Sequence, residues 1–310
     1  MDITETDLDA LKCRSSATKS GYIHDPFIKF FSPSRNSHKP PIINRGTYVR
    51  TWSIDHILQK FIESFDGKKQ IISLGAGTDT RVFRYISEYG PENLKFIEFD
   101  FYPNCIRKIR TIEKHEALKQ NIGDYVVDIS GGSLVSGSLD IYSYDIREIV
   151  HKGFPGFVDF SLPTIVLSEC CLCYLEPEEA SSLCRWFQNM FATSGIVVYE
   201  PIQGMDNFGK MMKANLSARG VILKTLDCYE TTEQQRMRFL DYGYSEVIAE
   251  DFLTIEETWI PIEEKKRTMS IEMLDELEEW QLLAKHYCLT FAATENLWNQ
   301  IILQLPHLKT

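Results

Sequence analysis

The chain has 310 residues, of which 44% are hydrophobic and 12% aromatic, so it can bury a substantial core and is not expected to be mainly disordered. Its formal net charge of -11 at pH 7 argues against electrostatic attraction to nucleic acid as the main source of binding. No apolar run approaches the ~20 residues of a membrane helix, and the first residues lack a basic or apolar signal region, which predicts a soluble cytoplasmic protein without a membrane partner.

The first part of the chain is predicted to be an extension that lies over the core. Residues 7–18 indicate a helix, and a stretch rich in Pro and Ser up to Pro41 indicates a loop. Residues 42–50 lead into a helix with apolar side chains at helical spacing from Ile54 to Phe65.

A strand, a tight turn and a helix come next, and the core is organised around them. The apolar run Ile71–Leu74 ends in Gly75-Ala76-Gly77, and an amphipathic segment follows at 81–86. Glycine is needed where backbone approaches a ligand without a Cβ in the way, and the N–H groups at the helix start point into the same space. The turn therefore predicts a nucleotide-type site, although two glycines alone are a weak signal.

The strand and helix pattern continues and implies parallel strands joined by right-handed crossovers. Residues 130–138 are rich in Gly and Ser and are predicted to be a loop. The further predicted elements are strands at 95–100, 141–145, 164–169, 195–200, 244–249 and 286–292, and helices at 103–120, 177–191, 206–216, 231–241 and 271–283.

These elements predict a single α/β domain over residues 1–310, with an N-terminal helical extension at 1–50 and an inserted lid on the substrate side at about 201–250. The helix at 271–283 is expected to bury its Met273, Leu274, Leu277 and Leu282 side. The acidic stretch from Glu250 to Glu279 fits either a docking face for a basic partner or a solvated helix face.

The acids at the strand ends narrow the choice of nucleotide. A dinucleotide turn has a third glycine three positions after the second, where this chain has Thr80. Asp100 ends the second strand twenty-three positions after Gly77, where a ribose-binding carboxylate belongs. With Asp145 and Glu169 at two further strand ends, the pattern suits S-adenosyl-L-methionine, whose positive sulfonium favours an acidic cleft.

Cysteine and histidine residues give no catalytic or metal-binding pattern. The eight cysteines are scattered, as expected of reduced cytosolic thiols. The cluster Cys170-Cys171-Leu172-Cys173 invites a zinc interpretation but lacks a second Cys/His pair at ligand spacing, so buried thiols and no metal are predicted. Structural or surface positions are predicted for His24, His56, His115 and His286.

Several unusual blocks, taken in order, closely resemble the leucine carboxyl methyltransferases. The resemblance runs from about Leu11 to the last strand and is carried by residues 43–50, 74–80, 99–101, 168–174, 199–201 and 286–288. It implies a class I S-adenosylmethionine-dependent methyltransferase with a Rossmann-like, mostly parallel seven-stranded sheet. It also implies the substrate, the C-terminal leucine α-carboxylate of the catalytic subunit of protein phosphatase 2A. A monomer is expected, although no sequence pattern specifies the oligomeric state.

The resemblance also implies roles for individual residues. Gly75 would contact the cofactor through its backbone, and Asp100 would bind the ribose. Asp145 and Ile146 would flank the adenine, while Glu169 would hold the amino-acid end. Arg50 would pair with the cofactor carboxylate, where a guanidinium fork suits a planar anion. Arg14 stands where the family has a cofactor-binding lysine.

The reaction that follows needs no general base, because a C-terminal carboxylate with a pKa of ~3.5 is already ionised at neutral pH. Arg50, Tyr48 and Tyr174 are the candidate donors near the reacting carboxylate, and for both tyrosines a packed aromatic role is the alternative. Two rival functions remain: a tRNA wybutosine-type carboxyl methyltransferase, disfavoured by the acidic balance, and a non-catalytic cofactor-binding regulator of the phosphatase.

Overall fold

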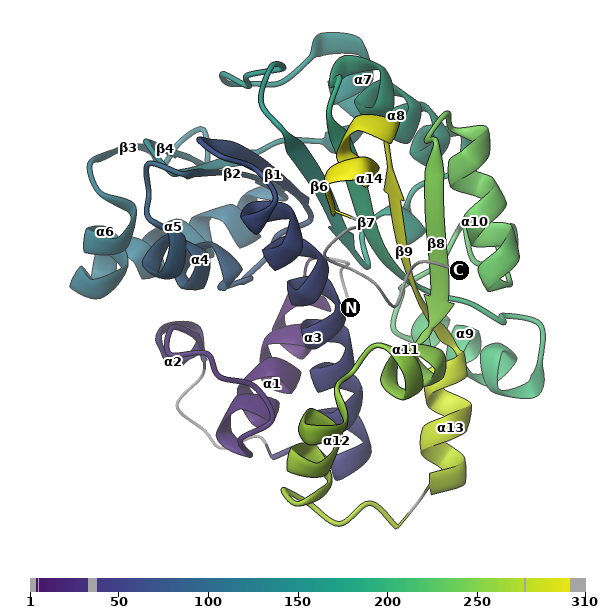
Figure 1. The fold of residues 1–310 in the computed structure, drawn as a ribbon. Helices are drawn as coiled ribbons and strands as arrows, with labels where there is room; N and C mark the ends of the chain where they lie inside the picture. The colour runs from purple at the N-terminus through teal and green to yellow at the C-terminus, as the bar shows by residue number, and fades with distance from the viewer. Residues whose placement is uncertain (1–3, 5, 33–37, 276, 302–310) are drawn as a thin grey trace.

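The computed structural model describes residues 4, 6–32, 38–275 and 277–301, drawn in colour in Figure 1. Within these residues the centre is a nine-stranded sheet in the order β3-β4-β5-β2-β1-β6-β7-β9-β8. The strands are β1 (Lys69–Leu74), β2 (Leu94–Asp100), β3 (Tyr125–Asp128), β4 (Ser133–Ser136), β5 (Leu139–Ser143), β6 (Thr164–Glu169), β7 (Ser194–Pro201), β8 (Glu246–Asp251) and β9 (Tyr287–Ala293).

The middle of the sheet is parallel, as the alternation of strands and helices predicts. Strands β5, β2, β1, β6 and β7 pair in parallel, and β9 lies antiparallel between β7 and β8. These seven strands are the predicted sheet. The two additional strands, β3 and β4, form an antiparallel extension at the β5 edge.

The prediction of a loop at 130–138 is wrong, because β4 lies inside it. Gly132 adopts a φ of +67° in the turn between β3 and β4. Leu134 is buried, whereas its neighbour Val135 is exposed and pairs with Val126 across the ladder. The glycines thus mark a hairpin turn whose second strand is short and alternates between its two faces.

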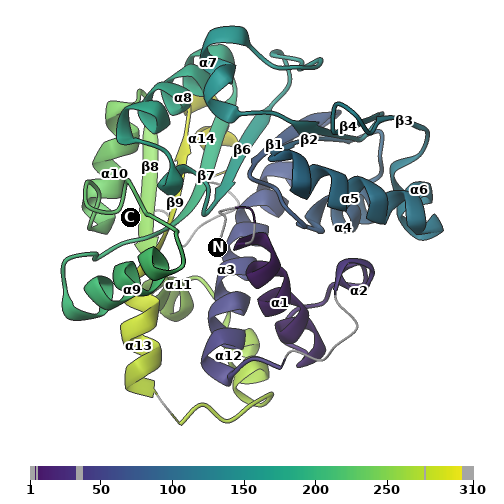
Figure 2. The same cartoon turned by 180° about the vertical axis from the view of Figure 1, so that it is seen from behind.

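Helices cover both faces of the sheet, as Figures 1 and 2 show. The helices are α1 (Thr6–Lys19), α2 (Ile28–Phe31), α3 (Pro41–Glu63), α4 (Arg81–Tyr89), α5 (Tyr102–Lys114), α6 (Glu116–Ile122), α7 (Ile149–Lys152), α8 (Pro177–Met190), α9 (Asn207–Ala218), α10 (Thr232–Asp241), α11 (Phe252–Thr258), α12 (Ile262–Met269), α13 (Leu277–Lys285) and α14 (Glu295–Ile301), with 3-10 turns η2 (Ile146–Glu148) and η3 (Leu172–Tyr174).

Strand β1 is buried on both faces. Ile71 packs into one hydrophobic cluster with α3, α4, α5, α6 and α14, whereas Ile72 packs into the opposite cluster with α7, α8 and α10. A strand buried on both faces has a continuous apolar sequence, which is why Ile71–Leu74 shows no alternation.

Two predicted helices differ from the structure. The segment from Pro103 to Gln120 is two helices, because His115 is extended between α5 and α6. The helix predicted at 271–283 begins only at Leu277. Its expected apolar side is largely in solvent, with Met273 82% exposed, and the buried positions of α13 are Trp280 and Ala284.

One end of the sheet is covered by helices from distant parts of the chain. Figures 1 and 2 both place α1, α3, α9, α11 and α13 at this end, where the parallel strands have their carboxyl ends. Helix α1 packs on α3, and α9 follows β7. We call α1 together with residues 205–224 the cover. In the described part of the chain, no helix combines the length and hydrophobicity needed to cross a membrane.

Candidate active site

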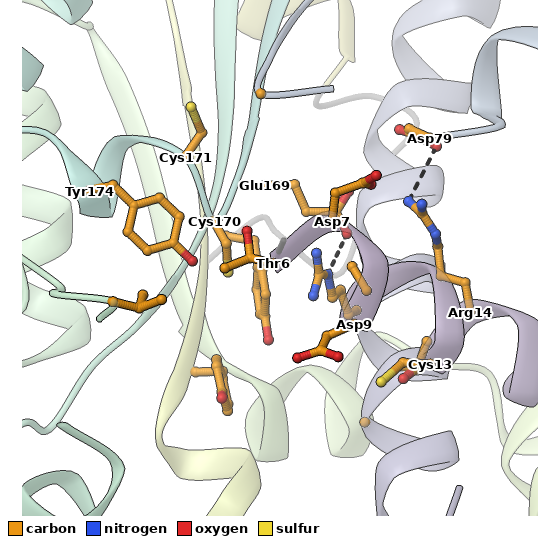
Figure 3. A pocket seen from close by; sticks show the side chains of 18 of the residues that line it. Thr6, Asp7, Asp9, Cys13, Arg14, Asp79, Glu169, Cys170, Cys171 and Tyr174 are labelled. Atoms are coloured by element: carbon orange, nitrogen blue, oxygen red, sulfur yellow. Dashed lines mark hydrogen bonds and ion pairs between the residues drawn. The ribbon is translucent and has the colours of Figure 1, made fainter. Parts of the chain in front are cut away.

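A cavity of about 400 Å³ lies between the carboxyl ends of β1, β2 and β6 and the cover. Six of the residues predicted from the sequence line it: Arg14, Arg50, Gly75, Asp100, Glu169 and Tyr174. Figure 3 shows the α1 side chains facing Glu169, Cys170, Cys171 and Tyr174 across this space. The parallel fold therefore brings together residues that are up to 160 positions apart, from Arg14 to Tyr174.

The turn after β1 needs its glycines for conformation and for space. Gly75 and Gly77 have φ values of +66° and +50°, in the left-handed region that glycine tolerates best. A Cβ on Gly75 would lie 3.0 Å from Cys171 Sγ, and one on Gly77 would lie 2.2 Å from Asp7 Oδ1. Both glycines therefore let the side chains of Cys171 and Asp7 approach the turn closely.

Asp100 ends β2 beside this turn and is held by three donors. Its carboxylate accepts from Gly77 N at 2.6 Å, from Phe101 N at 2.6 Å and from Asn104 Nδ2 at 2.9 Å. Burial raises the pKa of Asp100 above its usual value, while these hydrogen bonds oppose the rise. A carboxylate has about four acceptor positions, so a lone pair of Asp100 remains for a ligand hydroxyl.

Glu169 ends β6 and connects two arginines. It forms a short ion pair with Arg50 of α3 and accepts from Arg81 Nη1 of α4 at 2.6 Å. Burial raises the pKa of the Glu169 carboxyl, but Arg50 and Arg81 lower it more strongly, so that it falls from 4.5 to about 2. Glu169 is consequently ionised at neutral pH, and it fixes the direction of the Arg50 side chain.

Arg81 and Arg14 extend this network around the helix start at α4. Arg81 also bonds Asp79 and Asp55, each at 2.7 Å. Arg14 of α1 donates to Thr78 Oγ1 at 3.0 Å and pairs with Asp79 at 3.9 Å, the ion pair drawn in Figure 3. The Nε atom of Arg14 is buried with no hydrogen-bond partner, so this guanidinium at the cavity wall has an unused donor.

Aromatic rings form the wall beneath Arg50. The Tyr199 ring lies 4.6 Å from the Arg50 guanidinium carbon and stacks on Phe252 and Tyr287 at 5.0 and 5.4 Å between ring centroids. A cation over a stacked aromatic face loses water and rotational freedom. The stack therefore positions Arg50 from below while Glu169 holds it from the side.

Tyr174 is placed at the cavity as predicted, whereas Tyr48 is not. Burial raises the pKa of the Tyr174 hydroxyl, which stays a neutral donor at neutral pH. Tyr48 is 4% exposed, and its hydroxyl donates to Glu264 at 3.1 Å. It lies on α3 only two positions before Arg50, and this offset turns the two side chains toward different faces of the helix.

Asp145 and Ile146 follow β5 and do not line the cavity. The Asp145 carboxylate caps η2 and pairs with Arg147 at 2.6 Å. None of His24, His56, His115 and His286 lines the cavity either. Among the residues that the structure describes, no group of three or more His, Cys, Asp or Glu side chains could hold a metal ion.

The cover contributes site residues that sequence reasoning missed. Asp7 Oδ1 accepts from the backbone N–H and the hydroxyl of Thr78, at 2.8 and 2.7 Å, and Asp7 Oδ2 pairs with Arg107 at 3.0 Å. Asp9 pairs with Arg219, which follows α9. The only available signal was that two acids open a predicted helix, which is equally typical of any helix N-terminus.

Comparison with known proteins connects this geometry with an activity. The sequence profile described as "Leucine carboxyl methyltransferase" matches residues 2–188. The chain is 41% identical to "Leucine carboxyl methyltransferase 1" of Emericella nidulans over 92% of this chain and 83% of the relative. It is 33% identical to the "Leucine carboxyl methyltransferase 1 homolog" of Arabidopsis thaliana, over 94% and 89% of the two chains.

Among solved structures, a putative methyltransferase from Thermobifida fusca is similar, with a TM-score of 0.56 and 14% identity over 94% of both chains. At this identity the similarity concerns the fold alone. The predicted fold class is confirmed.

Proposed function

The chain belongs to the leucine carboxyl methyltransferase family, and we propose that it esterifies the C-terminal leucine α-carboxylate of the protein phosphatase 2A catalytic subunit. Family membership makes it an enzyme that methylates carboxyl groups and uses S-adenosyl-L-methionine. The observation that carries the proposal is the convergence of Asp100, Glu169 and Arg50 on one cavity at the carboxyl ends of three parallel strands.

The lining residues fit S-adenosylmethionine in this cavity. Asp100 retains an acceptor for a ribose hydroxyl, and the ionised Glu169 suits an ammonium group. Arg50 and Arg14 line the cavity and offer guanidinium charge to the cofactor carboxylate, and Gly75 has no side chain between its backbone and the cavity. When bound, the cofactor supplies an electrophilic methyl group on a positive sulfur.

The roles of Asp145 and Ile146 at the adenine rest on the family resemblance. Neither side chain lines the cavity, so this part of the proposal requires the adenine to extend toward the end of β5. Tyr48 is not carried forward as a donor to the reacting carboxylate, because its hydroxyl bonds Glu264 on the other side of α3.

The protein's own task in the reaction is to dehydrate and align an anion. The leucine carboxylate is the nucleophile and needs no base, so Arg50 and Tyr174 act as donors that hold it in line with the methyl group. Arg50 is already paired with Glu169, which moderates its attraction for the substrate. A carboxylate that is not fully neutralised keeps its reactivity after leaving water.

The direct test supplies labelled S-adenosylmethionine with the phosphatase catalytic subunit, either intact or lacking its last leucine. We expect label in the intact subunit only, and we expect mild base to release it as methanol, as an ester requires. Label that persists without the leucine, or that survives base, would contradict the proposal.

We further propose that the enzyme works as a monomer in the cytoplasm. All eight cysteines are free thiols, as is usual in a reducing compartment. Sedimentation at micromolar concentration should give a single species of 35.9 kDa, and a dimer would contradict the monomer.

A further inference from the structure

Three cysteines lie directly after the catalytic strand β6, and the proposed reaction uses none of them. Cys170 follows Glu169 and has a φ of +54°, which is rare for a residue with a Cβ. Cys170 and Cys171 line the cavity, whereas Cys173, on η3, is 1% exposed. Two thiols thus line the cavity wall next to a strained backbone, and a third, Cys173, is buried in the cluster against which Cys170 packs.

The Cys170 side chain packs against the small buried cluster that contains Cys173. The neighbouring Cys173 thiol lowers the pKa of the Cys170 thiol, burial opposes this, and the Arg50 charge lowers it further. Burial raises the pKa of both Cys171 and Cys173. The three thiols are therefore unequal, and Cys170 is the one whose thiolate the site favours.

We propose that Cys170 and Cys173 form an oxidant-sensitive dithiol in the cavity wall, in which Cys170 is the attacking thiolate and Cys173 the resolving thiol. With hydrogen peroxide, the Cys170 sulfur attacks one peroxide oxygen and releases hydroxide, which leaves a sulfenic acid. The Cys173 sulfur then attacks the Cys170 sulfur, a disulfide forms, and the sulfenic oxygen leaves as water. The peroxide is reduced, and the two thiols are oxidised.

Such a disulfide would disturb the active site through short connections. Cys170 is covalently next to Glu169, and its backbone N–H donates to Tyr199 O at 2.9 Å. Cys173 is next to Tyr174 and packs beneath Met212 and Leu216 of the cover. A shift of Cys170 moves Glu169, which orients Arg50, and a shift of Cys173 moves Tyr174, which holds the substrate carboxylate. Oxidation should therefore lower methyl transfer, a consequence that rests on the proposed function, and dithiothreitol should restore it.

The test begins with the intact wild-type protein, so it does not depend on a variant that folds. The protein is treated with limiting hydrogen peroxide, free thiols are alkylated, and peptides are mapped by mass spectrometry without reduction. We expect a disulfide between Cys170 and Cys173 to form before oxidation of the exposed Cys228. A disulfide that involves Cys171, or both thiols still alkylated while Cys228 is oxidised, would overturn the assignment.

Variants then separate the two roles. Cys173→Ser should leave a sulfenic acid on Cys170 that dimedone traps, whereas Cys170→Ser should show no dimedone adduct at Cys173. Cys228→Ser is the matched control and should behave as the wild type. An adduct on Cys173 in Cys170→Ser would reverse the roles. Because thiol mapping does not involve methyl transfer, a protein that forms the disulfide but shows no methylation activity even when fully reduced would contradict the proposed function alone.

Discussion

The floor and the cover of the cavity are built in different ways. The floor consists of the glycine turn, Asp100 and Glu169, which lie at the ends of buried parallel strands, and its charges are held by several short contacts each. In the cover, α1 is tied to the floor through Asp7 and Thr78, but α9 is held more loosely, since its single buried residue is Gly209 and the Arg219–Asp9 pair is largely exposed. The floor is thus preorganised for chemistry, whereas the α9 part of the cover can separate from it at low cost.

The largest effect should come from removing a donor at the floor. In Arg50→Ala the leucine carboxylate loses its guanidinium partner, and we expect kcat/KM for phosphatase methylation to fall by about a hundredfold or more, as for an oxyanion donor. The measurement is ester formation with labelled cofactor. The matched control is Arg236→Ala, an exposed arginine that does not line the cavity. Equal activity of the two variants would remove Arg50 from the mechanism.

Acid should destabilise the floor through Glu169. Folding lowers the pKa of this carboxyl from 4.5 to about 2, so its contribution to stability is complete above pH ~4.5 and is lost as the pH falls toward 2. The contribution is on the order of 3 kcal/mol, at about 1.4 kcal/mol per pKa unit.

Denaturant unfolding of the wild type and Glu169→Gln at pH 7, 5 and 3 measures this contribution. The stability difference between the two proteins should narrow as the pH falls, because the wild type alone loses an ionised carboxylate. The exposed Glu263→Gln is the control and should show a small, constant difference. A constant difference for Glu169→Gln would show that the charge at this position does not stabilise the fold.

A substitution where floor and cover meet should have an intermediate effect. Gly77→Ala introduces a left-handed alanine, which costs about 1–2 kcal/mol, and places its Cβ 2.2 Å from Asp7 Oδ1. Gly67→Ala carries the same conformational strain at a φ of +72° with no atom within 4 Å of its Cβ.

Conformational strain should therefore lower the free energy of unfolding by a similar amount in both alanine variants. Calorimetry should show weaker S-adenosylmethionine binding in Gly77→Ala alone, because only there are Asp7 and α1 displaced. If the two variants bind the cofactor equally, the contact between Asp7 and the turn has no role in forming the cavity.

The smallest effect on stability should come from the cover. Exposed ion pairs contribute about 0.2–1 kcal/mol, so Arg219→Ala should leave the free energy of unfolding nearly unchanged. Because Arg219 lines the cavity, the dissociation rate of the cofactor should rise several-fold, as measured by stopped-flow fluorescence. A large loss of stability with an unchanged dissociation rate would show that the cover is part of the rigid core.

The difference between the floor and the cover also explains how much of the molecule could be predicted from its sequence. Gly75, Asp100 and Glu169 each end an apolar run, and the rule that parallel strands share a carboxyl edge was enough to bring them together. The cover depends on contacts between distant segments, such as Asp9 with Arg219. The local sequence patterns that identify helices and strands do not predict such contacts. Tyr48 shows a third case: it was expected only in the segment that leads into a helix, but α3 begins at Pro41 and includes it, and the direction of its side chain depends on Glu264.

The wrong predictions at β4 and α13 have the same cause, because contacts with the rest of the fold decided both. A four-residue strand in a Gly- and Ser-rich stretch is stabilised by its neighbours in the sheet rather than by its own composition. At 271–283 the apolar periodicity was genuine, but Met273 and Leu277 remain in solvent. Periodicity predicts that a face is apolar, and only the rest of the fold decides whether that face is buried.

The contact between Asp7 and Thr78 has one more consequence, for cofactor choice. In dinucleotide-binding proteins the amides at such a turn receive a pyrophosphate. Here the Thr78 amide is occupied by a carboxylate of the chain itself, which also pairs with Arg107. Asp7 acts as a built-in substitute for the phosphate, so a phosphorylated nucleotide would have to displace α1 to enter, while a cofactor without phosphate meets no such competitor.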